Sequence, residues 1–146
     1  MDSKPALTDE LRRLIEERME HTLQGIEDTL QCIIEKYEIR FNDIKETIRS
    51  LEKSFSLLSQ KWNLEILYTL FLKNSMGFNS LKKILAINSR TLSDKLKVLN
   101  EYGYIKRIIE QGPPLRVTYS LTTRGKNTVL LALPLLYYSS SQFMSS

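Results

Sequence analysis

The sequence holds a single cysteine and a single histidine among its 146 residues, and each scarcity excludes a kind of site. Cys32 has no second cysteine with which to form an internal disulfide, and His21 alone beside it does not make a metal-ligand set of the usual spacing. No GxSxG motif, phosphate-binding loop or convergent acid/base set occurs either. We therefore expect no metal site, no cofactor and no catalytic residues, and an enzyme is the least favoured class of function.

Long apolar runs are scarce as well. The longest, at residues 129–138, reaches about half the length that a bilayer requires. Residues 1–5 lead into a charged helical pattern without the apolar stretch of a signal peptide. Because 42% of the residues are hydrophobic, the composition is that of a folded globular protein. We expect the protein to be cytoplasmic and to have no membrane partner.

Proline and glycine are almost missing from the first third of the chain. Between residues 7 and 58 there is no proline and one glycine, Gly25, and apolar residues recur every three or four positions: Leu7, Leu11, Ile15, Met19, Leu23, Ile26, Leu30, Ile33, Tyr37, Phe41, Ile44, Ile48, Leu51, Phe55 and Leu58. From Leu23 onward this is heptad spacing with one stutter, which predicts a coiled coil. One unbroken or gently kinked helix of about 50 residues is favoured. The alternative is a restart at Asn42–Asp43, where Glu46 would complete a capping box and leave helices of about 30 and 15 residues.

A helix of that length cannot fold back along a small domain, so its apolar stripe needs a partner. A second copy of the chain is the economical source, and a homodimer is expected. The alternative is an antiparallel helical hairpin within one chain. We interpret residues 1–58 as an N-terminal helical dimerisation extension, residues 59–138 as the following domain and residues 139–146 as a flexible tail.

Charge divides the chain at the same place. Residues 1–58 carry 9 Lys/Arg against 13 Asp/Glu, a net −4, whereas residues 59–146 carry 12 against 4, a net +8. A compact basic domain suits a polyanionic partner, because each neutralised phosphate releases condensed counterions. The alternative is a merely solvated basic surface.

Three helical patterns open the basic part. They cover residues 60–73, 79–85 and 89–102, with Leu81, Ile84 and Leu85 expected to point inward on the second helix. Ser89 is expected to cap the third helix, and Gly103 follows directly after its end. Three short helices in this order are the core of a helix-turn-helix domain.

Two strand patterns and a last helix follow. The β-branched and aromatic runs at residues 104–109 and 116–121 flank a Gly-Pro-Pro turn at residues 111–115, which predicts a β-hairpin, the wing. A strongly apolar helix then begins at about Thr123, and Pro134 is expected to bend or interrupt it. The predicted fold class is mainly α with a small β-hairpin, a winged helix-turn-helix domain preceded by a long helical or coiled-coil extension.

The third helix has one apolar face and one polar face. At about 100° per residue, Leu92, Leu96 and Leu99 point the same way and are expected to be buried. The N-terminal part of such a helix enters the major groove, where arginine bonds guanine bidentately and short hydroxyl side chains let the backbone approach. The candidates for base and phosphate contacts are therefore Ser89, Arg90, Thr91, Ser93 and Lys97. Asp94 would either accept from cytosine or orient Arg90. The alternative is an ordinary exposed helix face.

Further cations lie on the neighbouring elements. Lys82 and Lys83 on the second helix are candidates for phosphate contacts, and Lys106, Arg107 and Arg116 on the hairpin are candidates for contacts to the backbone or the minor groove. Lys106 and Arg107 cannot both face DNA, because neighbouring strand residues alternate between faces. We favour Arg116 most.

These residues resemble the HxlR family of winged helix regulators, relatives of the MarR group. The likeness runs from about Lys61 to Leu133 and includes Lys61-Trp62, Gly103-Tyr104-Ile105 and the Tyr-x-Leu-Thr-x-x-Gly motif at residues 119–125. It implies a dimer held by terminal helices, with two recognition helices presented to a palindromic operator on double-stranded DNA, and repression or activation of a nearby gene.

The chain also departs from that family. Many members carry a Cys-Pro pair shortly before Lys-Trp, but residues 51–55 here contain neither, so thiol sensing is not supported. The extension exceeds 50 residues where the family's is usually short, so the family's dimer geometry does not simply carry over. Two other functions stay open, an architectural DNA-coating protein and a winged-helix protein adaptor. The operator, the regulated gene and any small-molecule effector are not specified by the sequence.

Overall fold

The computed structural model describes residues 7–139, which fall into two compact units. One unit contains the residues up to Leu51 together with those from Ala132 onward, and the other spans Glu52–Leu131. Of the tail expected at residues 139–146, only Ser139 is described, and it is the last residue of a helix. No helix within residues 7–139 is long and apolar enough to cross a membrane.

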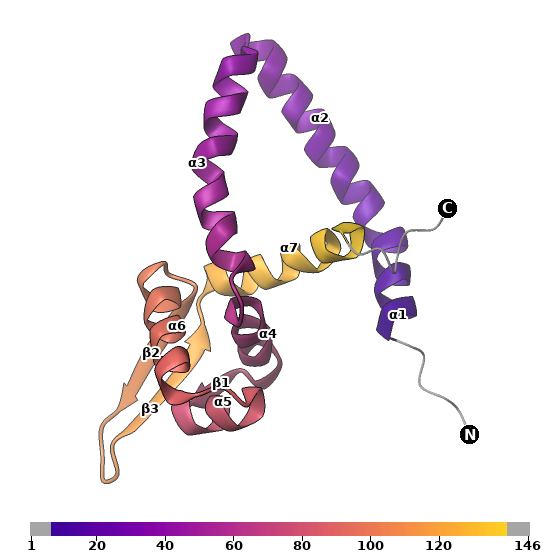
Figure 1. Ribbon diagram of the computed structural model, residues 1–146. Coiled ribbons are helices and arrows are strands. Elements are labelled where there is room, and N and C mark those ends of the chain that lie inside the picture. Colours follow the sequence, from indigo (N-terminus) through magenta and orange to yellow (C-terminus); the bar gives the residue numbers. More distant parts are fainter. Residues whose placement is uncertain (1–6, 140–146) are drawn as a thin grey trace, which may run out of the picture. The chain divides into compact units, whose positions relative to one another are not determined.

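The first unit begins with one long helical run. Helix α1 (Leu7–Leu14), the π-helical turn η1 (Ile15–Met19) and helix α2 (Glu20–Tyr37) follow one another without a break (Figure 1). A short turn then leads into α3 (Phe41–Ser59). The extension is therefore two helices, and the favoured expectation of one unbroken helix was wrong.

The break between α2 and α3 has a local cause. Glu38 adopts the left-handed conformation with φ 48° and ψ 48°, and the backbone N–H of Ile39 donates to the Ile34 carbonyl at 3.3 Å, which closes the end of α2. The Asp43 carboxylate accepts the backbone N–H of Arg40 at 3.1 Å. Asp43 thus caps the new helix from its third position, which is the reciprocal half of a capping box, whereas the sequence had suggested it as the starting residue.

The second unit contains the remaining elements. Helices α4 (Asn63–Lys73), α5 (Phe78–Leu85) and α6 (Ser89–Glu101) are followed by strands β2 (Ile105–Glu110) and β3 (Arg116–Leu121) and by the start of α7 (Thr123–Ser139). A short strand β1 (Ser75–Gly77) adds a third strand, in the order β1-β3-β2 with both pairings antiparallel. The predicted helices and hairpin are confirmed. The sequence missed β1, because three residues are too few for an alternating pattern.

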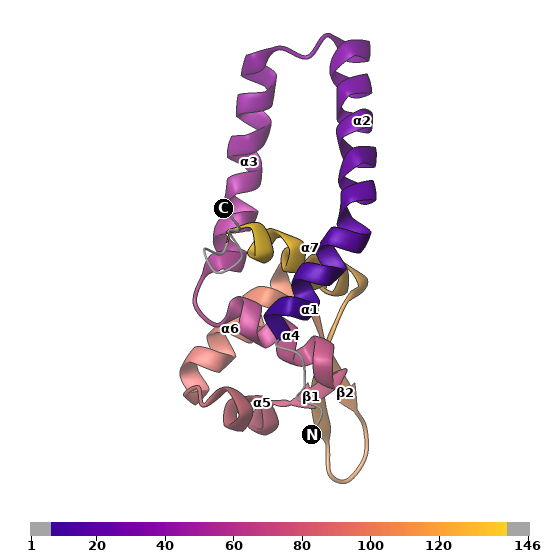
Figure 2. The ribbon, with the colours of Figure 1, turned by 90° about the vertical axis from the view of Figure 1, so that its right-hand side faces the viewer.

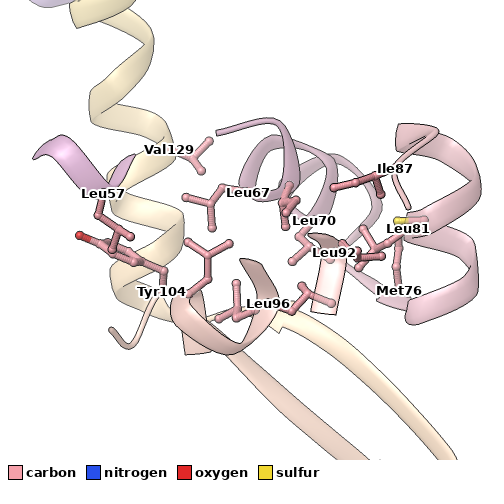
Figure 3. Close-up of a cluster of buried hydrophobic side chains, with 13 residues drawn as sticks. Leu57, Leu67, Leu70, Met76, Leu81, Ile87, Leu92, Leu96, Tyr104 and Val129 are labelled. Carbon is pink, nitrogen blue, oxygen red and sulfur yellow. The ribbon is translucent and has the colours of Figure 1, made fainter. Parts of the chain in front are cut away.

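One hydrophobic core holds this unit together. Figure 3 shows side chains from α4, α5, α6, β1 and α7 converging on it. Leu92, Leu96 and Leu99 are at most 2% exposed, as the face pattern of the third helix predicted. Ile84 is 54% exposed, so its expected inward orientation was wrong. Leu81 is fully buried and Leu85 is partly buried against the core, as expected.

The start of α4 depends on a buried polar contact. Asn63 is fully buried, and its side-chain amide donates to the Leu57 carbonyl near the end of α3 at 2.7 Å. Trp62 immediately before it has φ 80°, a left-handed conformation that reverses the chain. The predicted start at residue 60 was three residues too early, because periodicity continues through this turn without revealing it.

A second polar contact joins α4 to α7. The Tyr68 hydroxyl donates to the Val129 carbonyl at 3.0 Å, and burial raises the pKa of that hydroxyl above its ordinary value of 10.0. The α7 helix itself continues through Pro134, so the proline does not interrupt it.

Tyr68→Phe should lower the free energy of unfolding by about 1 kcal/mol, because it removes one hydrogen bond between helices. Because the pKa of Tyr68 is raised in the folded state, the contribution of this hydrogen bond to the free energy of unfolding is complete below pH 10.0. That contribution is lost as the pH rises further. Urea unfolding of the wild type and of Tyr68→Phe at pH 8 and above pH 10 tests this. The difference between their unfolding free energies should be smaller at the higher pH. A larger difference at the higher pH would contradict the proposed role of the Tyr68 hydrogen bond.

Candidate nucleic-acid interface

A three-residue turn sets α6 against α5. Ala86 ends α5 in the left-handed conformation with φ 52°, and its N–H bonds to the Lys82 carbonyl. Ile87 is 5% exposed and anchors the turn in the core. Asn88 is the residue that caps α6, since its side-chain oxygen accepts the Thr91 N–H at 2.8 Å. The sequence had given this cap to Ser89, one residue too late.

The cap leaves the N-terminal part of α6 exposed. Ser89, Arg90, Ser93 and Lys97 are exposed and Thr91 is partly buried, while the three leucines face the core. Because Asn88 holds the Thr91 N–H, Ser89 is not needed for capping and its hydroxyl stays on the outer surface. Asp94 is exposed on the same outer side of the helix. The arrangement is a fixed helix that presents short polar side chains and two cations to solvent.

The neighbouring cations of α5 and α6 have different surroundings. Lys82 and Lys83 lie in the last turn of α5 and are exposed, where their charges also suit the negative end of the helix dipole. Lys95 is partly buried, and its ammonium donates to the side-chain oxygen of Gln60 at 3.2 Å. Lys95 therefore ties α6 back to the start of the unit.

The wing sorts its cations by strand register. Lys106 lies opposite Ser120 and Arg107 opposite Tyr119, so the two cations point to different faces of the hairpin, as strand alternation predicted. Arg107 shares its face with the partly buried Tyr119. Arg116 lies directly opposite Glu110 at the outer end of the hairpin, on the face of Lys106. All three cations are exposed, and Figure 2 shows the strands extending beyond the helices of their unit.

Hydrogen bonds of the Thr122 hydroxyl connect the start of the wing to α7. The Thr122 hydroxyl donates to the Gly103 carbonyl at 2.6 Å and accepts the Gly125 N–H at 3.0 Å. Gly125 is buried against the Tyr104 carbonyl, and the Arg124 guanidinium lies 4.9 Å from the Tyr104 ring centre. These contacts explain why Thr122 and Gly125 stand three residues apart in the motif at residues 119–125. From the sequence alone the motif indicated only a family resemblance, and neither residue had a predicted role.

The fold is that of a winged helix-turn-helix protein. It contains the three helices α4, α5 and α6, of which α5 and α6 form the helix-turn-helix, and a β-hairpin that belongs to a three-stranded sheet. The model of the HxlR-like helix-turn-helix family matches residues 57–144. The chain belongs to that family.

Proteins with similar sequences are also named as helix-turn-helix regulators. The uncharacterized HTH-type transcriptional regulator YdzF of Bacillus subtilis is 38% identical over 77 residues, which cover 52% of this chain and 71% of that protein. The uncharacterized HTH-type transcriptional regulator YvaP of the same organism is 37% identical over 76 residues, covering 51% and 69%. These relatives are named as transcriptional regulators, and none of the names indicates an enzyme family.

Solved structures share the fold. A transcriptional regulator of the MarR family from Enterococcus faecalis superposes with a TM-score of 0.57 at 28% identity, covering 65% of this chain and 86% of that one. The reduced form of YodB from B. subtilis gives a TM-score of 0.58 at 24% identity, covering 62% and 88%, and supports the fold alone. The predicted family and fold class are therefore confirmed.

Proposed function

We propose that the protein is a dimeric regulator of transcription that reads a palindromic operator with α6 and the wing. The observation that carries this proposal is the exposed N-terminal face of α6, held rigid by the Asn88 cap and by three buried leucines. A helix fixed in this way can present the same side chains to the major groove at each encounter. Two copies would present two such helices to the halves of a palindrome.

Each candidate residue has a proposed role. Arg90 reads a base, with Ser89, Thr91 and Ser93 beside it, and Lys97 contacts phosphate. The exposed cations of α5 and the wing contact the sugar-phosphate backbone and fix the register: Lys82, Lys83, Arg116 and one of Lys106 and Arg107, which point to different faces of the hairpin. Of the wing cations, Arg116 at the outer end of the hairpin is the one we favour for the DNA flanking the recognition helix.

The basic and the acidic parts of the chain have different proposed functions. Residues 59–138 form the DNA-binding domain in this proposal, and the acidic residues 1–58 form the dimerisation extension. In this proposal the protein acts in the cytoplasm.

The test is binding of the purified full chain to its own upstream DNA and to random DNA of equal length, over a series of salt concentrations. A regulator should prefer the upstream DNA by about a thousandfold or more. Equal and strongly salt-dependent binding to both would instead indicate an architectural protein that coats DNA. Absence of binding at low salt would overturn the proposal in favour of a protein adaptor.

A further inference from the structure

An unusually large apolar face lies uncovered on the helical arm, which we define as residues 20–51, α2 with the first part of α3. Nine large apolar side chains of this arm are between 37% and 78% exposed: Leu23, Ile26, Leu30, Ile33, Tyr37, Phe41, Ile44, Ile48 and Leu51. Together they present on the order of 1,000 Å² of apolar surface, well above the largest patch of about 300–600 Å² on a typical monomer. It also exceeds the roughly 800 Å² that each partner contributes to a standard interface.

The two halves of the arm carry matched stripes. Leu30 and Ile48 each lie nine residues from Ile39 in the turn, and Tyr37 and Phe41 each lie two residues from it. Near the turn both stripes line one hollow, which is formed by Leu30, Ile34, Ile39, Asp43, Ile44, Thr47 and Ile48. The helices separate beyond that point (Figures 1 and 2), so neither stripe covers the other.

The apolar face of α2 is too wide for one neighbouring helix. Its Ile34 edge faces the hollow shared with α3. Its other edge forms a second hollow, lined by Thr22, Gly25, Ile26, Thr29, Leu30 and Ile33, to which α3 contributes nothing. A helix with two apolar edges needs a neighbour on each, as in a four-helix bundle.

We propose that the arms of two copies associate as an antiparallel four-helix bundle, in which each α2 packs between its own α3 and the α3 of the second copy. This inference rests on the dimeric part of the proposed function and names the surface that dimerises. Both stripes then face the bundle core, and the second edge of α2 receives the partner's helix.

Charge favours this pairing over contact between the two α2 helices. Helix α2 carries Glu20, Glu27, Asp28 and Glu35 against Lys36, a net −3. The part of α3 within the arm carries Asp43 and Glu46 against Lys45 and Arg49, a net charge of zero. Placing the two acidic helices on the diagonal of the bundle keeps like charges apart.

The first experiment measures the mass of the full chain in solution by light scattering after size exclusion. The wild type should have twice the chain mass of 17.0 kDa. Ile26→Glu on α2 and Ile48→Glu on α3 should each give the monomer mass, because both stripes lie in the bundle core. The matched controls Gln31→Glu and Ser50→Glu, exposed and away from the stripes, should remain dimers.

The outcomes separate the bundle from other interfaces. Loss of the dimer with Ile26→Glu alone would indicate a two-helix coiled coil of α2 and would overturn the bundle. Loss with Leu131→Glu on α7, with both arm variants still dimeric, would place the interface on α7 instead. A monomeric wild type would show that the arm closes as a hairpin within one chain.

A second variant keeps the test independent of helix stability. A Cβ atom at Gly25 would meet nothing within 4 Å in a single chain, and leucine favours helix more than glycine does. Gly25→Leu should therefore preserve or raise the helix content of the arm and yet weaken dimerisation at least tenfold, because it fills the hollow that receives the partner. Gln31→Leu is the control. A Gly25→Leu dimer as tight as the wild type would overturn the bundle.

These readouts do not depend on DNA. Monomeric arm variants that still prefer upstream DNA over random DNA, with weaker affinity, would leave the regulator proposal intact. A wild-type dimer that binds no DNA would retain the bundle and remove the regulator.

Discussion

Replacing Gly125 by valine is expected to destabilise the second unit by about 3 kcal/mol or more. A Cβ atom at this position would lie 2.0 Å from the Tyr104 carbonyl oxygen and 3.0 Å from the carbonyl carbon, both of them backbone atoms that cannot rotate away. The helix α7 would have to move off the start of β2, and the bonds of the Thr122 hydroxyl to Gly103 and Gly125 would be lost with it. Overpacking costs about 1–3 kcal/mol where side chains yield, and a backbone clash belongs at or beyond the upper end.

Urea unfolding followed by the fluorescence of Trp62, which packs against the core of this unit, measures the loss. Gly77→Ala is the matched control, since its Cβ would lie 3.6 Å from the Val117 carbonyl, an ordinary contact. It should change the unfolding free energy by less than about 1 kcal/mol. A valine variant with the stability of this control would show that α7 does not pack against Tyr104 as described.

The second unit was largely predictable from its sequence, because local pattern and burial agree there. The leucines of α6 recur with the helical period, and Gly103 with φ 79° ends that helix where glycine is needed. The features that were missed depend on contacts that lie outside the helix and strand periods. Asn63 is buried by its bond to Leu57, and β1 exists only by pairing with β3.

The extension was harder to predict for a different reason. The apolar stripe continues from Tyr37 to Phe41 at ordinary helical spacing, although the chain turns between them. A stripe that is matched on both sides of a turn looks the same in the sequence as one long coiled-coil seam. Only the capping group Asp43 marked the alternative, and Glu38, which takes the left-handed conformation, is not a residue that signals a turn.

The candidate DNA-contacting residues are chosen by charge and exposure. The sequence could therefore identify them, but it could not show which of them are best placed to contact DNA. The structure adds that Lys106 and Arg107 lie on different faces of the wing and that Lys95, an equally basic residue of α6, is held by Gln60. Arg90 lies in the first turn of α6 beside the Asn88 cap. It is the cation of this helix whose position at the N-terminal end best suits contact with a base edge.

Arg90→Ala should therefore lower affinity for the specific operator by about 1–3 kcal/mol, roughly 5- to 150-fold, while affinity for random DNA falls much less. Arg116→Ala should weaken binding to both DNAs to a similar degree and reduce the salt dependence by about one phosphate contact. The reason is that a bidentate bond to guanine distinguishes base pairs, whereas a bond to phosphate does not.

Binding isotherms of both variants on operator and random DNA, each at several salt concentrations, separate these roles. Glu101→Gln, an exposed change at the far end of α6, is the control for an altered charge on the same helix. Equal losses on the two DNAs for Arg90→Ala would mean that Arg90 contacts the backbone. The base-reading role would then pass to the hydroxyl side chains of Ser89, Thr91 and Ser93, whose shorter reach requires the helix to sit deeper in the groove.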